Sequence, residues 1–359
     1  MASTVLPNND QPFEKAASVK LDRSMSCREA FRVIAGSCIR QIIANEPGMC
    51  AGHAEALHQL RVGLRRLRAA IKAFAETTAD PQQKRVKAEL KWVMQQIGPA
   101  RDLDVFGIDV LEPLVRVDIH DPHLAATHRS YNKMRRQAHE SARCSIRSDR
   151  FRKILLDLAE WIEVGPWTTD PALKKLRERE ITEHAAELLT RWRRRFRKRG
   201  KKLSDLSPQQ RHNLRMRAKD LRYVIEFFAS LFPGREHAKR REAALVALEK
   251  LQDTLGALND LIARKRIMPK EIDESVHAKR LIAAQENEAG ELVDVGHVAE
   301  QFKRTLEGDF LRLSHEGQMA FWLTAGIGPP RRHRIQLGLG ARRHDLSLLE
   351  KDLSARAID

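Results

Sequence analysis

The chain has 359 residues, 42% of them hydrophobic, which is enough for a sizeable buried core and excludes a disordered chain. Lys and Arg number 65 against 48 Asp and Glu, and the resulting net charge of +17 indicates a polyanionic partner. No apolar run approaches the length of a membrane span. The four cysteines show no paired metal-ligand spacing, so we expect a reducing compartment rather than a disulfide framework.

Apolar residues recur with the period of an amphipathic helix between the prolines, and alternating strand patterns are scarce. Residues 1–20 contain acids and prolines and lack an apolar signal-peptide core, so we expect a loose tail there. From residue 323 onwards glycines, prolines and arginines interrupt the pattern, which predicts a mobile basic tail over 323–359. The sequence thus predicts an all-α fold, with helices near 22–46, 53–78, 82–97, 102–116, 123–147, 149–163, 171–199, 208–231, 235–264, 275–290 and 296–322.

The chain repeats itself. Residues 57–76 align without gaps to residues 211–230, with an offset of 154. Further along, IGPARDLD at 97–104 matches LGALNDLI at 255–262 with an offset of 158, so one small insertion separates the two matches. A repeat of this length predicts two related helical units, each large enough to be a bundle.

Each copy carries cations beside its core stripe. On a helix, the core stripe of the first copy is Leu60, Leu64, Leu67, Ile71 and Phe74. A second stripe, centred roughly 120° away and called here the first basic row, is His58, Arg61, Arg65, Arg68 and Lys72. The second copy keeps most of it as the second basic row, which is His212, Arg215, Lys219 and Arg222, with Glu226 at the position of Lys72.

Successive members of a basic row lie about 5–6 Å apart. Arginines at this spacing suit a chain of phosphates, because each guanidinium can donate paired hydrogen bonds to phosphate oxygens. A histidine adds a donor whose charge rises beside an anion. The first copy also has no acid among its cations before Glu76, so the row is not neutralised within its own helix.

Two simpler interpretations stay open. Rows of Arg and Lys are often solvated faces whose aliphatic stems cover the core. In the second interpretation, His58 and His212 are structural residues that form hydrogen bonds to a neighbouring helix or to a helix cap. A metal role is disfavoured, because neither histidine lies in HxxxH or HExxH, and the HDPH turn at 120–123 reads as two solvated histidines. We expect no metal and no cofactor.

The densest charge lies in RWRRRFRKRGKK at 191–202, and residues 171–222 contain eighteen Lys or Arg against six Asp or Glu. Trp192 and Phe196 are four residues apart and are predicted to anchor this helix to the core, although aromatics among arginines also stack on bases. The run also resembles a nuclear localisation patch. The charge and spacing nominate three further anion-binding residues, Arg191, Arg194 and Lys198.

The segments LHQLRVGLRRLRAAIKAF, IGPARDLDVF, RHNLRMRAKDLRYVIEFF and LEKLQDTLGALNDLIA, with FW at 321–322, resemble the CHAD family of conserved-histidine α-helical domains. The resemblance runs in order over roughly residues 20–322. It implies two pseudo-twofold-related four-helix bundles with a basic groove or channel between them. The implied domains are a tail at 1–20, a first bundle at 21–165, a second at 166–322 and a tail at 323–359.

The resemblance also implies that inorganic polyphosphate binds to inward-facing basic residues. By matching motif positions these are His58, Arg61, Arg65, Arg68, His212, Arg215, Lys219 and Arg222. Arg101 of the GPARD motif is added, with Asn259 in its place in the second copy. Lys72 and the positions on 191–202 come from charge and spacing alone. The ExExK strand of triphosphatase-fused family members does not occur in this chain.

We therefore expect a non-catalytic polyphosphate-binding module, with nucleic-acid backbone binding as the alternative. An enzyme would need a carboxylate metal site or an activated nucleophile, whereas Asp102, Asp104, Asp253 and Asp260 read as structural pairs or caps. We expect no membrane partner. The expected location is the cytoplasm, at polyphosphate granules, or the nucleus or nucleolus in a eukaryotic cell.

Overall fold

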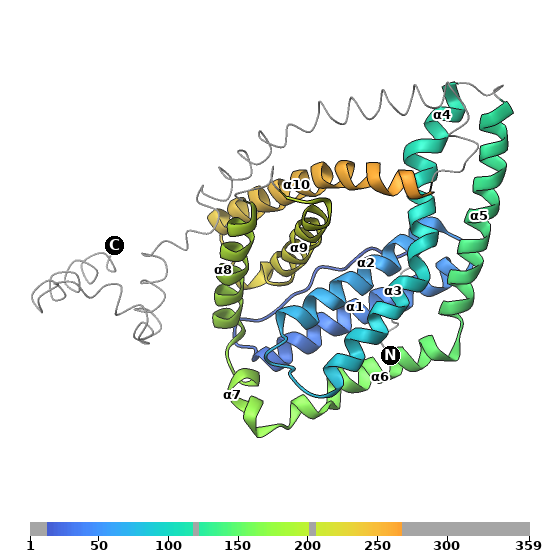
Figure 1. Ribbon diagram of the computed structural model, residues 1–359. Helices are drawn as coiled ribbons and strands as arrows, with labels where there is room; N and C mark the ends of the chain where they lie inside the picture. The colour runs from blue at the N-terminus through green and yellow to red at the C-terminus, as the bar shows by residue number, and fades with distance from the viewer. Residues whose placement is uncertain (1–12, 118–121, 201–205, 268–359) are drawn as a thin grey trace, which may run out of the picture. The chain divides into compact units, whose positions relative to one another are not determined.

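The computed structural model describes residues 13–117, 122–200 and 206–267 (Figure 1). Within these ranges every regular element is helical, and an isolated backbone bridge joins Ser26 to Glu180, so the all-α prediction is confirmed. None of the described helices is long and apolar enough to cross a membrane. The predicted helices 275–290 and 296–322 and the tail 323–359 lie outside the described residues. The bundle arrangement and the domain boundaries therefore stay predictions.

The long helices follow one another with short connections. They are α1 (Cys27–Cys50), α2 (Ala54–Ala73), α3 (Gln82–Phe106), α5 (Pro122–Ile146), α6 (Asp149–Val164), α8 (Ile181–Gly200), α9 (Pro208–Phe227) and α10 (Arg235–Ile267). Shorter pieces are the π-helical η1 (Gly107–Leu111), α4 (Glu112–Val117), η2 (Pro166–Thr168), η3 (Pro171–Leu173), α7 (Lys174–Arg177) and η4 (Ala229–Leu231). α1 packs along α2, α3 along α5 and α9 along α10, while α2 contacts both α3 and α9.

Local sequence signals fix where several helices begin. Ser26 caps α1 and Ser207 caps α9, each in a capping box whose partner is Glu29 or Gln210. In such a box two backbone N–H groups at the helix start gain side-chain acceptors. Pro208 follows Ser207 at the first helical position, where its missing N–H costs nothing.

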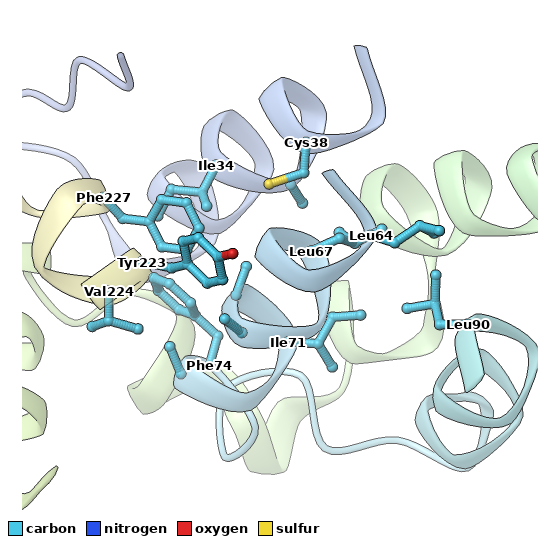
Figure 2. Close-up of a cluster of buried hydrophobic side chains, with 14 of the residues drawn as sticks. Ile34, Cys38, Leu64, Leu67, Ile71, Phe74, Leu90, Tyr223, Val224 and Phe227 are labelled. Carbon is cyan, nitrogen blue, oxygen red and sulfur yellow. The ribbon is translucent and has the colours of Figure 1, made fainter. Parts of the chain in front are cut away.

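The core joins α1, α2 and α9. Every side chain of the predicted α2 core stripe is at most 1% exposed, which confirms that stripe. Figure 2 shows Tyr223, Val224 and Phe227 of α9 beside Phe74 of α2, with Ile34 of α1 close by. Fully burying one such large apolar side chain contributes about 1.5–3 kcal/mol. This shared core holds the two repeated helices, α2 and α9, against one another.

Two predicted helices, 82–97 and 102–116, are wrong as separate elements. α3 continues through Pro99 to Phe106, and the break comes later, at the π-helical segment 107–111. Proline removes one backbone hydrogen bond from the helix, yet Ile97, Ala100 and Leu103 on either side of it are buried. Burial of this face keeps the helix continuous, and packing overrides the local proline signal.

The single helix predicted over 171–199 is also wrong. α7 ends at Arg177 and α8 begins at Ile181. Between them the Cys27 N–H donates to the Arg179 carbonyl at 2.8 Å, and the Ile181 N–H donates to the Met25 carbonyl at 3.0 Å. These bonds tie the start of α1 to the start of α8, and they use backbone groups that a continuous helix would need.

Candidate functional site

The first basic row lies along α2, beside the buried stripe. His58, Arg61 and Arg65 are half-buried, whereas Arg68 and Lys72 are exposed. The half-buried end of the row lies against α3, since α2 packs on both α3 and α9. The row is therefore not a solvated face throughout, because its first three members lose much of their contact with water.

The second basic row lies along α9, which packs against α2, α8 and α10. Its members His212, Arg215, Lys219 and Arg222 are all half-buried. The contact between α2 and α9 thus brings cations from two distant parts of the sequence to one region of the molecule. The two basic rows that the sequence predicts therefore lie on helices that pack against one another.

Two ion pairs cross this contact and mirror one another. Arg66 pairs with Glu226 at 3.2 Å, and Lys72 pairs with Asp220 at 2.5 Å. In the repeat alignment Arg66 corresponds to Asp220 and Lys72 corresponds to Glu226, so exchanging the two copies converts one pair into the other. A twofold relation between α2 and α9 would produce such an exchange. It also explains why Glu226 replaces a basic residue, and it gives a role to Arg66, which sequence reasoning missed.

Lys219 is the residue on which the two rows converge. Its pKa is lowered from 10.5 to about 7, first by burial and then by four arginines, which are Arg65, Arg215, Arg222 and Arg61. Two of these arginines come from α2 and two from α9. Lys219 and Arg65 are equivalent positions of the repeat, separated by the same offset as the rows. We call these five residues the cation cluster.

The two α2 members of the cluster, Arg61 and Arg65, also have lowered pKa values. Burial lowers the pKa of Arg61 to about 10, with Arg65 adding to the effect. Burial also lowers the pKa of Arg65, and Arg215 and Arg68 contribute in the same direction. Guanidinium groups resist deprotonation, so these shifts measure how unfavourable the surroundings are for positive charge.

Two glycines provide space for arginines of the cluster. A β-carbon on Gly98 of α3 would lie 3.5 Å from Arg61 Nη1, and one on Gly256 of α10 would lie 3.0 Å from Arg215 Nη2. Arg215 Nε also donates to the Gln252 carbonyl at 3.2 Å. Sequence reasoning gave these glycines no role, although Gly98 and Gly256 occupy equivalent positions in the matched segments 97–104 and 255–262. This equivalence was the signal from which a shared role could have been predicted.

Few acids neutralise the cluster. Arg61 lies 3.8 Å from Asp102, and Arg222 lies 3.5 Å from Glu226 and 3.7 Å from Glu249. Among the side chains that the structure describes, which do not include those of 257–267, no Asp or Glu oxygen lies within 4.0 Å of Arg65, Arg215 or Lys219. Arg61 Nη1 and Arg65 Nε are buried without a hydrogen-bond partner. A buried donor without a partner costs about 1–3 kcal/mol, and more when it is charged.

Comparisons with known proteins show which family the chain belongs to. The family model of the CHAD domain matches residues 33–268 of the sequence. The chain belongs to the CHAD family. The crystal structure of the CHAD domain from the plant Ricinus communis is similar to this chain at a TM-score of 0.66 and 24% sequence identity, over 82% of this chain and 96% of that one. At this identity the likeness supports the fold alone. No curated protein matches the sequence.

In this CHAD protein the histidine of the first basic row, His58, lies among cations. Burial lowers its pKa, and Arg101 lowers it more than Arg65 and Arg61 do. Arg101 also lowers the pKa of Arg61, so it lies near the cluster. A neutral His58 offers one N–H donor without adding charge.

The charged segment on α8 differs from the cation cluster. Arg191 pairs with Glu76 at 2.8 Å, and Arg194 and Lys198 are exposed. None of the three is among the groups that shift the pKa of Lys219. Phe196 is 4% exposed, and Trp192 packs partly buried against the core, which confirms the predicted anchoring role of these aromatics.

One of the acids named from the sequence of this CHAD chain has a clear structural role. Asp104 accepts hydrogen bonds from Arg135 at 2.7 Å and from His139 at 2.8 Å. Burial opposes its ionisation, yet these bonds, first that of His139, keep the pKa of Asp104 below its usual value. The carboxylate joins α3 to α5 beside the small core of Phe106 and Tyr131.

Proposed function

We propose that this CHAD protein binds inorganic polyphosphate, without catalysis, at the cation cluster between α2 and α9. One observation carries the proposal: five cations from two helices crowd together while few acids compensate them. Folding alone gives no reason to collect like charges in a half-buried place, because desolvation and repulsion both oppose it. A bound polyanion would supply the missing negative charge.

The chemistry of the cluster suits phosphate. Arginine donates paired hydrogen bonds to phosphate oxygens, and lysine adds a compact charge. The unpartnered atoms Arg61 Nη1 and Arg65 Nε are donors that a phosphate oxygen would satisfy. The rows extend beyond the cluster to His58 and His212, so a ligand with several phosphates gains more contacts than a single phosphate does.

The proposal contains no chemical step. The acids nearest the cluster, Asp102, Glu226 and Glu249, already lie against arginines. The exposed cations on α8 contribute long-range attraction, which speeds encounter with a polyanion. By this account the protein gathers at polyphosphate-rich sites in the cell.

A competition titration tests the proposal. The wild-type protein is titrated with short-chain polyphosphate, long-chain polyphosphate, RNA and duplex DNA at fixed salt and equal phosphate concentration. We expect polyphosphate to bind tightest and its affinity to fall steeply with salt, because binding releases counterions. Tighter binding of RNA or DNA would replace the proposal by the nucleic-acid alternative, and binding of none of them would refute it.

A pair of charge-matched variants places the binding. Arg65→Gln removes a cluster cation, whereas Arg152→Gln removes an exposed cation of α6 that pairs with Asp149. Both lower the net charge by one. The proposal expects a loss of about tenfold for Arg65→Gln, at 1.5 kcal/mol or more for a charge-assisted contact, and little change for Arg152→Gln. Equal losses would mean that net charge alone drives binding.

A further inference from the structure

Lys219 combines two features that are rarely found together. Its ε-amino group is held among arginines. No acid whose side chain the structure describes, a set that leaves out 257–267, lies within 4.0 Å of it. The residue is only half-buried. Part of its side chain therefore stays in contact with solvent, from which a small solute can approach.

The charged groups near Lys219 come from α2, α3, α9 and α10. Arg61 and Arg65 face it from α2, and Arg215 and Arg222 flank it on α9. From α3, Asp102 acts on Arg61 and Arg65, and from α10, Glu249 pairs with Arg222. Both acids serve arginines rather than the lysine. Positive charge on Lys219 is therefore disfavoured, and with a pKa of about 7 a substantial share of the amine is neutral in a neutral solution.

A neutral lysine amine is a nucleophile, and desolvation beside other cations is a known way to activate one. The same arginines attract phosphate groups. A small molecule that carries an electrophilic carbonyl next to a phosphate would therefore be held with its reactive carbon near the amine. Acyl phosphates are molecules of this kind.

We propose that Lys219 is a modification site, at which the ε-amino group is acylated by small acyl phosphates. The nitrogen lone pair attacks the carbonyl carbon and forms a C–N bond. The bond from that carbon to the phosphate oxygen then breaks, and phosphate leaves with the electron pair. The proton lost from nitrogen goes to the departing phosphate or to water, so the products are an amide and inorganic phosphate.

The surrounding arginines assist at two points. They hold the phosphate of the reagent before the attack, and they stabilise the charge that grows on the leaving phosphate. The amide cannot be protonated at neutral pH, so an acylated Lys219 can no longer take up a proton and add a positive charge to the cluster when an anion binds. This part of the inference rests on the proposed function, because both place a phosphate group between Arg65 and Arg215.

The wild-type protein tests the proposal directly. It is incubated with acetyl phosphate, and acetylation of each lysine is followed by peptide mass spectrometry. The exposed lysines Lys84 and Lys175 serve as internal controls. An ordinary lysine is neutral in only about one molecule in 1,000 near pH 7.4, so we expect Lys219 to react at least about tenfold faster than the controls. Equal or slower reaction of Lys219 would overturn the proposal.

The pH dependence of the rate gives a second, independent readout. The rate at Lys219 should level off above about pH 8, whereas the rate at an ordinary lysine keeps rising towards about pH 10. This measurement needs no variant and so does not depend on the folding of a mutant. A Lys219 profile that follows the two control lysines would contradict the proposed activation.

A neutral acetyl ester separates activation of the amine from guidance by phosphate. With acetyl phosphate, Arg65→Gln should slow acetylation of Lys219 several-fold more than it does with the ester. An equal effect with both reagents would overturn the guiding role of the arginines. Polyphosphate titration of the unmodified protein distinguishes the two proposals: acetylation without polyphosphate binding leaves only the modification site, and binding without selective acetylation leaves only the proposed function.

Discussion

The cation cluster and the α8 segment are both basic, but they differ in where their charge is placed. The segment 191–202 has nine Lys or Arg in twelve residues. Of the three named above, Arg194 and Lys198 are exposed and Arg191 pairs with Glu76. The cluster has only five cations, drawn from two helices, yet burial and neighbouring cations lower the pKa values of Arg61, Arg65 and Lys219. Charge density along a sequence thus does not reveal where charge is costly. Burial and neighbours across helices decide that, and a bound anion relieves the most cost at the cluster.

The largest expected effect comes from paired double variants of the two regions. Arg65→Gln with Arg215→Gln should weaken polyphosphate binding by about ten- to a thousandfold, at 1.5–3 kcal/mol per charge-assisted contact with allowance for non-additivity. Arg194→Gln with Lys198→Gln removes the same charge from exposed positions and should cost about threefold or less. Isothermal titration at two salt concentrations makes the comparison. A larger loss for the α8 pair would reverse the assignment.

Stability should distinguish compensated from uncompensated cations at the same helix contact. Arg66→Met leaves Glu226 half-buried with one fewer partner, so the free energy of unfolding should fall by about 2 kcal/mol. Lys219→Met removes a charge that is repelled by its neighbours, so the free energy of unfolding should rise by about 1 kcal/mol without ligand. Urea titrations of both variants measure these changes. A loss of stability in Lys219→Met would mean that the lysine has a structural partner.

The lowered pKa of Lys219 predicts opposite pH trends for stability and for binding. Between about pH 7 and 10.5 the unfolded chain carries a proton on this amine that the folded chain lacks, so stability increases with pH across this window and is lost as pH falls through 7. A bound polyanion favours the charged amine, so affinity should fall about three- to tenfold between about pH 7 and 8.5. Lys219→Met should remove this part of both trends, which melting curves and titrations at several pH values would show.

The smallest expected effect concerns the two glycines. Gly256→Ala places a β-carbon 3.0 Å from Arg215, closer than ordinary contacts, whereas Gly98→Ala places one 3.5 Å from Arg61. We expect Gly256→Ala to move Arg215 and to weaken polyphosphate binding about two- to fivefold, and Gly98→Ala to have less effect. Equal behaviour of the two variants would mean that the guanidinium groups adjust freely in both halves.

Sequence reasoning recovered the fold class and the repeat, because helical periodicity and the two matched segments are local properties of the chain. It failed at Pro99 and at 178–180, where buried packing and backbone bonds to the start of α1 outweigh local propensity. The rows were visible in the sequence, yet their convergence on Lys219 was not. Convergence depends on how α2 and α9 pack, and the exchanged ion pairs that guide this packing join residues about 150 positions apart.

A crystal structure of the protein with a short linear polyphosphate tests the central claim most directly. The account predicts phosphate oxygens within hydrogen-bonding distance, about 2.7–3.2 Å, of Arg65, Arg215 and Lys219, with the chain of phosphates continuing along the basic rows. Polyphosphate bound only along α8, with no phosphate among the five residues of the cluster, would contradict it.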